Sequence, residues 1–210
     1  MKSSQEWRKH VKAIDQANKP RLQEFITDDC GYQSSGKRIS VRISLDFDVP
    51  VETLFEIFTN LDIAAKLYWP IRIIHLKSSW DNDDRYGVNS ERALGPLPFV
   101  RYSERIVEKK TNSRLAWTVI GAAPVKNQSG VMDFTPLDNG RSRMLETVSL
   151  DVPFPFMAPF FAKEIWKSNV LAFLRAQTLI NEDPNFHKAV VALLQDESEG
   201  RQAVRGLRNT

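Results

Sequence analysis

Residues 134–152 read FTPLDNGRSRMLETVSLDV, and a turn divides them into two stretches of alternating apolar and polar residues. The DNG triplet at 138–140 is a strong hairpin signal, because Asn and Gly readily take up the backbone angles of a tight turn. The expected partners across this turn are Phe134 with Met144 and Met132 with Glu146. Side chains alternate between the two faces of a strand, so one face of this hairpin is expected to be apolar and to carry a carboxylate.

The hairpin closes a run of strand-like segments that extends from Ile39 to Leu150. The alternation and the intervening turns predict an antiparallel sheet of seven strands. They cover residues 38–49, 71–80, 88–94, 99–108 and 115–121, a segment that ends at 134–137, and 141–152. The expected partners across the TNS and GPLP turns are Ile106 with Trp117, Leu94 with Val100, and Arg92 with Tyr102.

These pairings collect one set of side chains on a single face of the sheet. The set is apolar and aromatic with three charged residues in it: Arg92, Tyr102, Glu104, Trp117, Met132, Phe134, Met144 and Glu146. A carboxylate on such a face must be paired, hydrogen-bonded or protonated, because an unpaired buried charge is very costly. Arg92 and Glu104 are expected to be diagonal neighbours, either as a structural ion pair or as groups that face a ligand.

A long amphipathic helix is expected from Phe156 to Ile180, after the last strand. Its apolar side includes Ile165, Trp166 and Phe173, and Asn169 falls near the middle of that side. An Asn in this position either bonds to a backbone group or faces an internal polar cavity.

The chain divides into three segments. Residues 1–36 are expected to form an N-terminal helical extension that ends in a loop, DDCGYQSSGK. Residues 37–181 are expected to form one ligand-binding domain, in which Pro50 begins a helix and a second short helix spans 62–67. Residues 182–210 are expected to form a C-terminal helix and tail.

Composition excludes several classes of function. The net charge of the 210 residues is only +3 and the basic residues are dispersed, which argues against nucleic-acid binding. No apolar run approaches the length of a transmembrane segment, and the polar N-terminus lacks a secretory signal, so the cytoplasm is the expected location. One cysteine and three widely spaced histidines predict neither a metal site nor a cofactor.

Three stretches resemble a known superfamily. ISLDFDVPVETLFEIFTNLD at 43–62 resembles its opening strand and helix, YSERIVEKKTNSRLAWTV at 102–119 its central hairpin, and FTPLDNGRSRMLETVSLDVP at 134–153 its penultimate hairpin. The order of elements over residues 38–180 looks like the helix-grip fold of the START and birch-pollen-allergen superfamily (SRPBCC), which includes polyketide cyclase/dehydrase-like proteins.

The resemblance implies an α+β fold in which the seven-stranded antiparallel sheet curls around the long C-terminal helix, with extra helices at both ends of the chain. It also implies a hydrophobic tunnel between sheet and helix. Members of the superfamily bind lipids, sterols, quinones, plant hormones or polyketides, and some are cyclases or dehydratases. They share no universal catalytic triad, so the resemblance assigns no catalytic residue.

The leading hypothesis is therefore a protein that binds a small hydrophobic ligand, such as a lipid, a quinone or a polyketide. Its expected contacts are Arg92, Tyr102, Glu104, Trp117, Met132, Phe134, Glu146, Ile165, Trp166, Asn169 and Phe173.

Two alternatives remain open. In a cyclase or dehydratase, Glu104 or Glu146 would be the general base, and Arg92 or Tyr102 would stabilise a developing enolate. In a protein-interaction module, the terminal helices would dock a partner. A homodimer would form through the apolar side of the first helix, which consists of Trp7, Val11 and Ile14.

Overall fold

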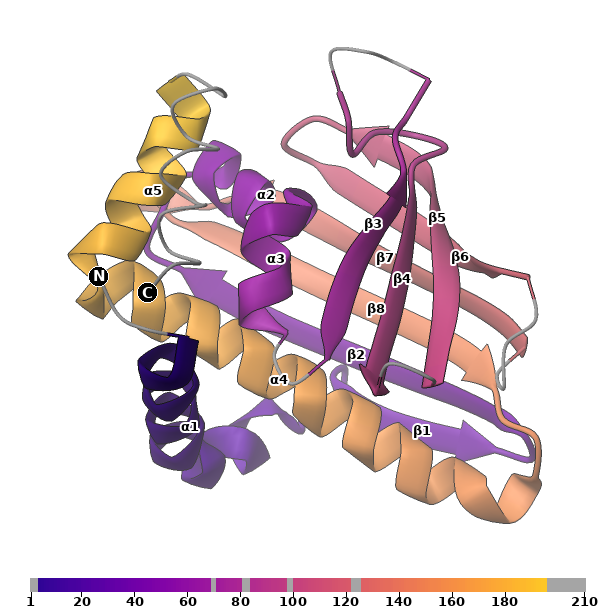
Figure 1. Cartoon of the computed structure of the whole chain (residues 1–210). Helices are drawn as coiled ribbons and strands as arrows, with labels where there is room; N and C mark the ends of the chain where they lie inside the picture. Colours follow the sequence, from indigo (N-terminus) through magenta and orange to yellow (C-terminus); the bar gives the residue numbers. More distant parts are fainter. Residues whose placement is uncertain (1–3, 69–70, 81–83, 98–99, 122–125, 196–210) are drawn as a thin grey trace.

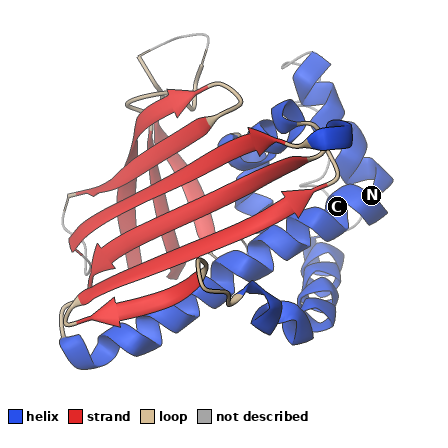
Figure 2. Cartoon of the chain, turned by 180° about the vertical axis from the view of Figure 1, so that it is seen from behind, coloured by secondary structure: helices blue, strands red, loops and turns tan. Residues whose placement is uncertain are grey.

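A computed structural model describes residues 4–68, 71–80, 84–97, 100–121 and 126–195. These residues form a curved antiparallel sheet of eight strands that wraps around one side of a long helix, α4 (Ala158–Glu182). Figures 1 and 2 show α4 crossing the concave face of the sheet, with the shorter helices gathered near its C-terminal half. This arrangement confirms the predicted α+β helix-grip fold.

The strands follow one another in space almost as they do in sequence. The sheet order is β1-β2-β8-β7-β6-β5-β4-β3, so only the β2–β8 neighbours are distant in the chain. The strands are β1 (Gly31–Ser35), β2 (Arg38–Phe47), β3 (Arg72–Lys77), β4 (Glu91–Leu97), β5 (Val100–Lys110), β6 (Arg114–Ile120), β7 (Lys126–Pro136) and β8 (Ser142–Asp151).

Helices fill the connections and both ends of the described chain. The α-helices besides α4 are α1 (Ser4–Asn18), α2 (Val51–Thr59), α3 (Leu61–Leu67) and α5 (Pro184–Gln195). Short 3-10 helices occupy Lys19–Phe25, Asp138–Gly140 and Pro155–Met157.

The predicted strand count of seven is wrong by one. The additional strand is β1, within the DDCGYQSSGK segment that was expected to be a loop. β1 pairs with β2 through a tight turn, in which Gly36 has a φ of 57°. Tyr32 is the one large apolar side chain of β1, so the segment lacks the alternation that marks a strand. The strand forms because β2 offers it an open edge to pair with.

Two of the three predicted hairpin registers are confirmed. Ile106 lies opposite Trp117, and Phe134 lies opposite Met144. The β4–β5 register differs by two residues from the prediction, because β4 continues through Pro96 and its pairing is irregular between Leu94 and Leu97.

A shift of two residues keeps every side chain on its predicted face, since the strand repeat is two. Arg92 is consequently opposite Glu104, not Tyr102, and Leu94 is opposite Tyr102, not Val100. Arg92 and Glu104 are direct partners, not the diagonal neighbours that were expected.

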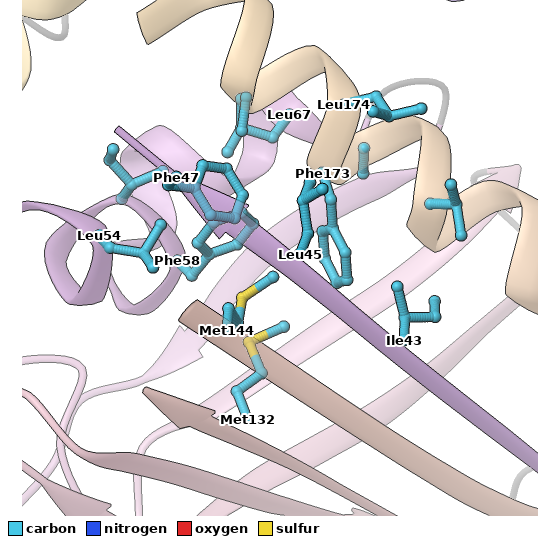
Figure 3. Packing of buried hydrophobic residues seen from close by; sticks show 14 of the residues in the cluster. Ile43, Leu45, Phe47, Leu54, Phe58, Leu67, Met132, Met144, Phe173 and Leu174 are labelled. Atoms are coloured by element: carbon cyan, nitrogen blue, oxygen red, sulfur yellow. The ribbon is translucent and has the colours of Figure 1, made fainter. Parts of the chain in front are cut away.

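The main core lies between the concave face of the sheet, α2 and α4. Figure 3 shows Phe173 of α4 among Leu45, Phe58 and Met144. Phe58 meets the rings of both Phe47 and Phe173 edge-on, with ring centroids 5.8 and 5.3 Å apart. These contacts bury the apolar side of α4 and fix its distance from the sheet.

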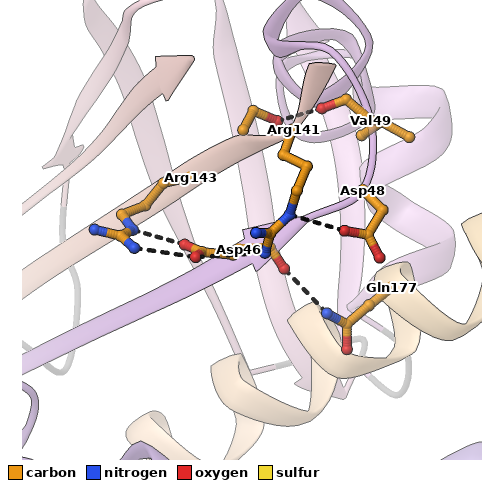
Figure 4. Close-up of polar contacts among 7 residues, drawn as sticks. Asp46, Asp48, Val49, Arg141, Arg143 and Gln177 are labelled. Atoms are coloured by element: carbon orange, nitrogen blue, oxygen red, sulfur yellow. Dashed lines mark hydrogen bonds and ion pairs between the residues drawn. The ribbon is translucent and has the colours of Figure 1, made fainter. Parts of the chain in front are cut away.

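Polar contacts along β2 hold the last turns of α4 at one end of the sheet (Figure 4). Gln177 Nε2 donates a hydrogen bond of 3.0 Å to the carbonyl oxygen of Asp46. The side chain of Asp46 accepts two hydrogen bonds from Arg143 on β8, and this cation lowers the pKa of the Asp46 carboxyl. α4 is thereby attached to backbone that is itself braced across β2 and β8.

The N-terminal helix α1 is part of the same packed unit. Val11 and Ile14, which were predicted as part of a possible dimer contact, are buried within the chain. Asp15 accepts hydrogen bonds of 2.8 and 2.7 Å from Arg175 of α4, a residue that is only 2% exposed. Arg175 also donates to the carbonyl oxygen of Leu67 at the end of α3. One buried cation therefore joins α1, α3 and α4.

Candidate functional site

A buried ion pair occupies the inner face of β4 and β5. Arg92 Nε donates a hydrogen bond of 2.9 Å to Glu104 Oε2, and both residues are more than nine-tenths buried. Gln128 of β7 donates from Nε2 to the other carboxylate oxygen, Oε1, also over 2.9 Å. Four neighbouring strands, β4 to β7, thus contribute to one buried polar cluster, which we define as Arg92, Glu104, Trp117 and Gln128.

Trp117 of β6 completes this cluster. The guanidinium carbon of Arg92 lies 5.2 Å from the centre of the indole ring, a distance typical of a cation–π contact. The Trp117 side chain also hydrogen-bonds to Glu104. The indole lies across the inner side of Gly130, where an added Cβ would come within 2.2 Å of the ring. Trp117 can adopt this position because its partner on β7 has no side chain.

Burial and hydrogen bonding act in opposite directions on Glu104. Loss of solvent raises the pKa of its carboxyl, while the Arg92 charge and the donors on Arg92, Trp117 and Gln128 lower it. The net direction is upward. The donors around Glu104 stabilise its ionised form at a position where burial alone would favour protonation.

A second carboxyl, Glu146 of β8, faces α4 and forms no ion pair with a described residue. Asn169 Nδ2 donates a hydrogen bond of 2.7 Å to Glu146 Oε2. Burial raises the pKa of Glu146 to about 8, against the lowering effect of the Asn169 hydrogen bond, and the negative charge of Glu104 raises it further. Glu146 is therefore largely protonated at neutral pH and can donate as well as accept a hydrogen bond.

Two tyrosines are electrostatically coupled to these carboxyls. Burial raises the pKa of Tyr68, which follows α3, and the charge of Glu146 raises it further. Burial also raises the pKa of Tyr102 on β5, where the charge of Glu104 acts in the same direction and the amide of Gln128 opposes it. Both phenols remain protonated and available as hydrogen-bond donors.

Two buried polar atoms near this region have no hydrogen-bond partner among the described residues. They are Oε1 of Gln128 and Nε1 of Trp166, in residues that are 5% and 2% exposed. An unsatisfied buried polar atom in a native protein needs an explanation, such as an ordered water or a bound molecule. Gln128 is of particular interest, because its other amide atom already bonds to Glu104.

The structure brings some of the sequence-predicted residues together and separates others. Arg92, Glu104 and Trp117 are in contact, and Glu146 contacts Asn169. Three aromatic residues lie toward other elements: Phe134 packs on Phe55 of α2, Phe173 on Phe58, and Trp166 on Tyr32 of β1. Met132 is buried opposite Glu146, and Ile165 is partly buried against the core.

Sequence reasoning missed three residues at this site. Gln128 shares the inward parity of Gly130, Met132 and Phe134, so extending the alternation of β7 backward would have found it. No pattern in the sequence marks Gly130 or Tyr68, because Gly130 matters through its contact with the Trp117 ring and Tyr68 through its burial near Glu146.

Neither a metal cluster nor a membrane-spanning helix occurs among the described residues. No three His, Cys, Asp or Glu side chains among them are placed to hold a metal ion. No described helix combines the length and the apolar character that a membrane span requires.

Solved structures resemble the chain in fold at low sequence identity. A conserved protein of unknown function from Enterococcus faecalis aligns over 87% of this chain and 98% of its own, with a TM-score of 0.55 and 15% identity. A START superfamily protein from Mycobacterium smegmatis aligns over 67% and 98%, with a TM-score of 0.54 and 15% identity. Ara h 8.0201 aligns over 69% and 99%, with a TM-score of 0.51 and 14% identity.

No family model matches the chain, and no curated protein matches it. The likeness to the solved structures therefore concerns the arrangement of elements, and it agrees with the sheet order and helix position described above. The chain has the helix-grip fold of the START and birch-pollen-allergen superfamily.

Proposed function

We propose that this protein binds a small hydrophobic ligand, such as a lipid, a quinone or a polyketide, between the inner face of the sheet and α4. The ligand would lie against Trp117 and Met132 and reach the polar groups of Gln128, Glu146 and Asn169. Such a combination of apolar surface with a few placed polar groups is typical of small-molecule sites.

The unsatisfied Oε1 of Gln128 is the observation that carries this proposal. An interior built only for stability would place an apolar residue here or satisfy both amide atoms. The free acceptor of Gln128 would instead receive a hydrogen bond from a hydroxyl or amide group of the ligand. Protonated Glu146 offers a second polar contact on β8, so the preferred ligand has a polar group attached to an apolar body.

Two measurements test ligand binding. Native mass spectrometry of gently purified protein should reveal a co-purifying small molecule, and titration with 8-anilino-1-naphthalenesulfonate should saturate at one probe per chain. The Gln128→Leu variant should bind the co-purified molecule about three- to tenfold more weakly, which corresponds to the loss of one hydrogen bond. Gln33→Leu on the exposed β1 is the matched control and should leave affinity unchanged. Failure of the wild type to take up either molecule would refute the proposal.

A second function, acid–base catalysis of the cyclase or dehydratase type, is favoured by Glu146 alone. A buried carboxyl with a pKa of about 8 can release and accept a proton at neutral pH. Asn169 would hold this carboxyl in place through its 2.7 Å hydrogen bond. Tyr68 would supply a protonated hydroxyl that stabilises developing negative charge on the substrate.

The two functions differ in what happens to the bound molecule. Incubation of the co-purified molecule with the protein, followed by mass spectrometry, would show loss of water or a change of structure if catalysis occurs. Glu146→Gln should then stop conversion while ligand binding persists. Recovery of an unchanged molecule from the wild type after prolonged incubation would eliminate catalysis of that ligand.

A further inference from the structure

The start of α4 and the segment before it lie at the end of the molecule that is far from α1 and α5 (Figure 1), and they carry three exposed phenylalanines. Phe154, Phe156 and Phe160 are 56%, 81% and 64% exposed, although large apolar side chains are normally buried. The rings of Phe154 and Phe156 stack on each other with their centroids 5.7 Å apart. These three residues form one exposed aromatic group, which we call the Phe cluster.

The backbone presents the Phe cluster in a restrained conformation. The segment reads PFPFMAPFF from 153 to 161, so three prolines restrict its backbone angles. Phe161, the next residue on α4, packs partly against the core and contacts the ring of Phe160. The exposed rings are therefore held on a rigid support, and little conformational entropy would be lost when they enter an apolar phase.

Three lysines occupy backbone positions near the Phe cluster. Lys37 accepts a hydrogen bond of 2.9 Å at its carbonyl oxygen from the backbone of Val152, and Lys126 is the strand partner of Asp151. Lys163 follows Phe160 by three residues on α4, which places the two side chains on the same side of the helix. All three lysines are exposed.

The nearby acidic groups are already bonded to other side chains. Asp151 accepts hydrogen bonds from Arg38 and Asn127, and Glu164 pairs with Lys167 at 2.9 Å. The described part of this end of the molecule therefore carries an excess of positive charge beside its exposed aromatic rings.

We propose that the Phe cluster and its lysines dock this protein on an anionic lipid bilayer. Phenylalanine rings enter the boundary between headgroups and acyl chains, while lysines remain among the anionic headgroups. The start of α4 inserts, and the remainder of the domain stays above the headgroups.

Charge favours a bilayer over a second copy of the chain as the partner. A symmetric dimer through the Phe cluster would bring the same surface of each copy together and place Lys37, Lys126 and Lys163 near their counterparts. Such like-charge contacts oppose association. An anionic bilayer provides an apolar phase for the aromatic rings and negative charge for the lysines.

Flotation with lipid vesicles tests the docking surface in the full chain. Wild-type protein at about 0.1 M salt should float with vesicles that contain phosphatidylserine in phosphatidylcholine, and much less with phosphatidylcholine alone. The double variant Phe156→Ser/Phe160→Ser should bind at least about tenfold more weakly. The triple variant Lys37→Glu/Lys126→Glu/Lys163→Glu should lose its preference for the anionic vesicles.

The matched control is Trp80→Ser. Trp80 is 76% exposed, lies in the connection between β3 and β4 and does not belong to the Phe cluster, so its replacement should leave vesicle binding unchanged. Circular dichroism should show that all three variants are folded, because every substituted side chain is exposed.

Three results would overturn the docking proposal. The first is that wild-type protein does not float with anionic vesicles. The second is that the double Phe variant floats as well as wild type. The third is that wild-type protein does not bind vesicles but forms a concentration-dependent dimer, and that only the double Phe variant abolishes this dimer. The experiment is independent of the proposed ligand, since it measures flotation without uptake of a small molecule.

Discussion

Arg92 and Glu104 face each other across β4 and β5 and form a buried ion pair 2.9 Å long. One residue further along the same two strands, Glu91 and Arg105 form a second pair at the same distance, but Arg105 is 42% exposed. The two pairs share strands, residue types and distance. They differ in burial and in their additional contacts, since Gln128 also bonds Glu104 and Lys77 lies 3.9 Å from Glu91, so a comparison of the two pairs measures the effect of the buried environment as a whole.

We expect Arg92→Met to destabilise the protein by about 3–5 kcal/mol, because it leaves the Glu104 carboxylate buried without its cation. Arg105→Met, the exposed counterpart, should cost about 1 kcal/mol or less. The double variant Arg92→Met/Glu104→Met should be more stable than the sum of its single substitutions predicts. Urea denaturation followed by circular dichroism measures all four values, and additive losses would contradict a coupled pair.

Glu146 makes stability depend on pH in a defined direction. Its pKa is about 8 in the folded protein, against 4.5 for an ordinary glutamate, so the folded state binds the extra proton over this interval. The stabilising contribution is complete below pH 4.5 and is lost as pH rises through about 8. Thermal denaturation between pH 5 and 9 should show a decline in wild type that Glu146→Gln reduces. Parallel curves for the two proteins would show that Glu146 is not the group responsible.

Gly130→Ala should destabilise the protein by about 1–3 kcal/mol, since its new methyl group must displace the Trp117 ring. The displaced indole should also lose its contact with Arg92, which near-ultraviolet circular dichroism would detect as a changed aromatic signal. Ser129→Ala on the exposed side of the same strand is the control and should change stability by less than about 0.5 kcal/mol. An unchanged aromatic spectrum in Gly130→Ala would refute the proposed packing.

The strand registers show how much of the sheet could be predicted from the sequence. The β5–β6 and β7–β8 registers were predicted correctly, because short turns with Asn or Gly connect the strands. The β4–β5 register was wrong by two residues, since β4 pairs irregularly between Leu94 and Leu97. The predicted face of Arg92 and Glu104 was nevertheless correct, because a shift of two residues does not change the face of a side chain.

What sequence reasoning missed depends on tertiary contacts. β1 exists as a strand through its pairing with β2, and its residues GYQSS give no period-two signal. Gln128 is the exception, because extending the alternation of β7 backward from Met132 would have placed it on the inner face. The N-terminal helix was expected to be an extension packed on the main domain, but the particular contact between Asp15 and Arg175 cannot be read from residues 160 positions apart.

Asp15→Ala should cost about 3–5 kcal/mol of stability, because it removes the carboxylate that pairs with the buried guanidinium of Arg175 at 2.7 Å. Burial already lowers the pKa of the Arg175 guanidinium, and Asp15 opposes that shift. Lys9→Ala on the exposed side of α1 should have little effect. Urea denaturation tests this pair of variants, and equal midpoints would contradict the role of Asp15.

The Asp15–Arg175 contact also has a geometric consequence for α4. Arg175 follows Asn169 by six residues, about 9 Å along the helix axis and about a third of a turn around it. A continuous helix has one rotational setting, so an anchor at Arg175 also determines the direction in which Asn169 points. The N-terminal helix thus sets the angular alignment of a side chain that it does not touch, and changes in α1 should alter how firmly Glu146 is held.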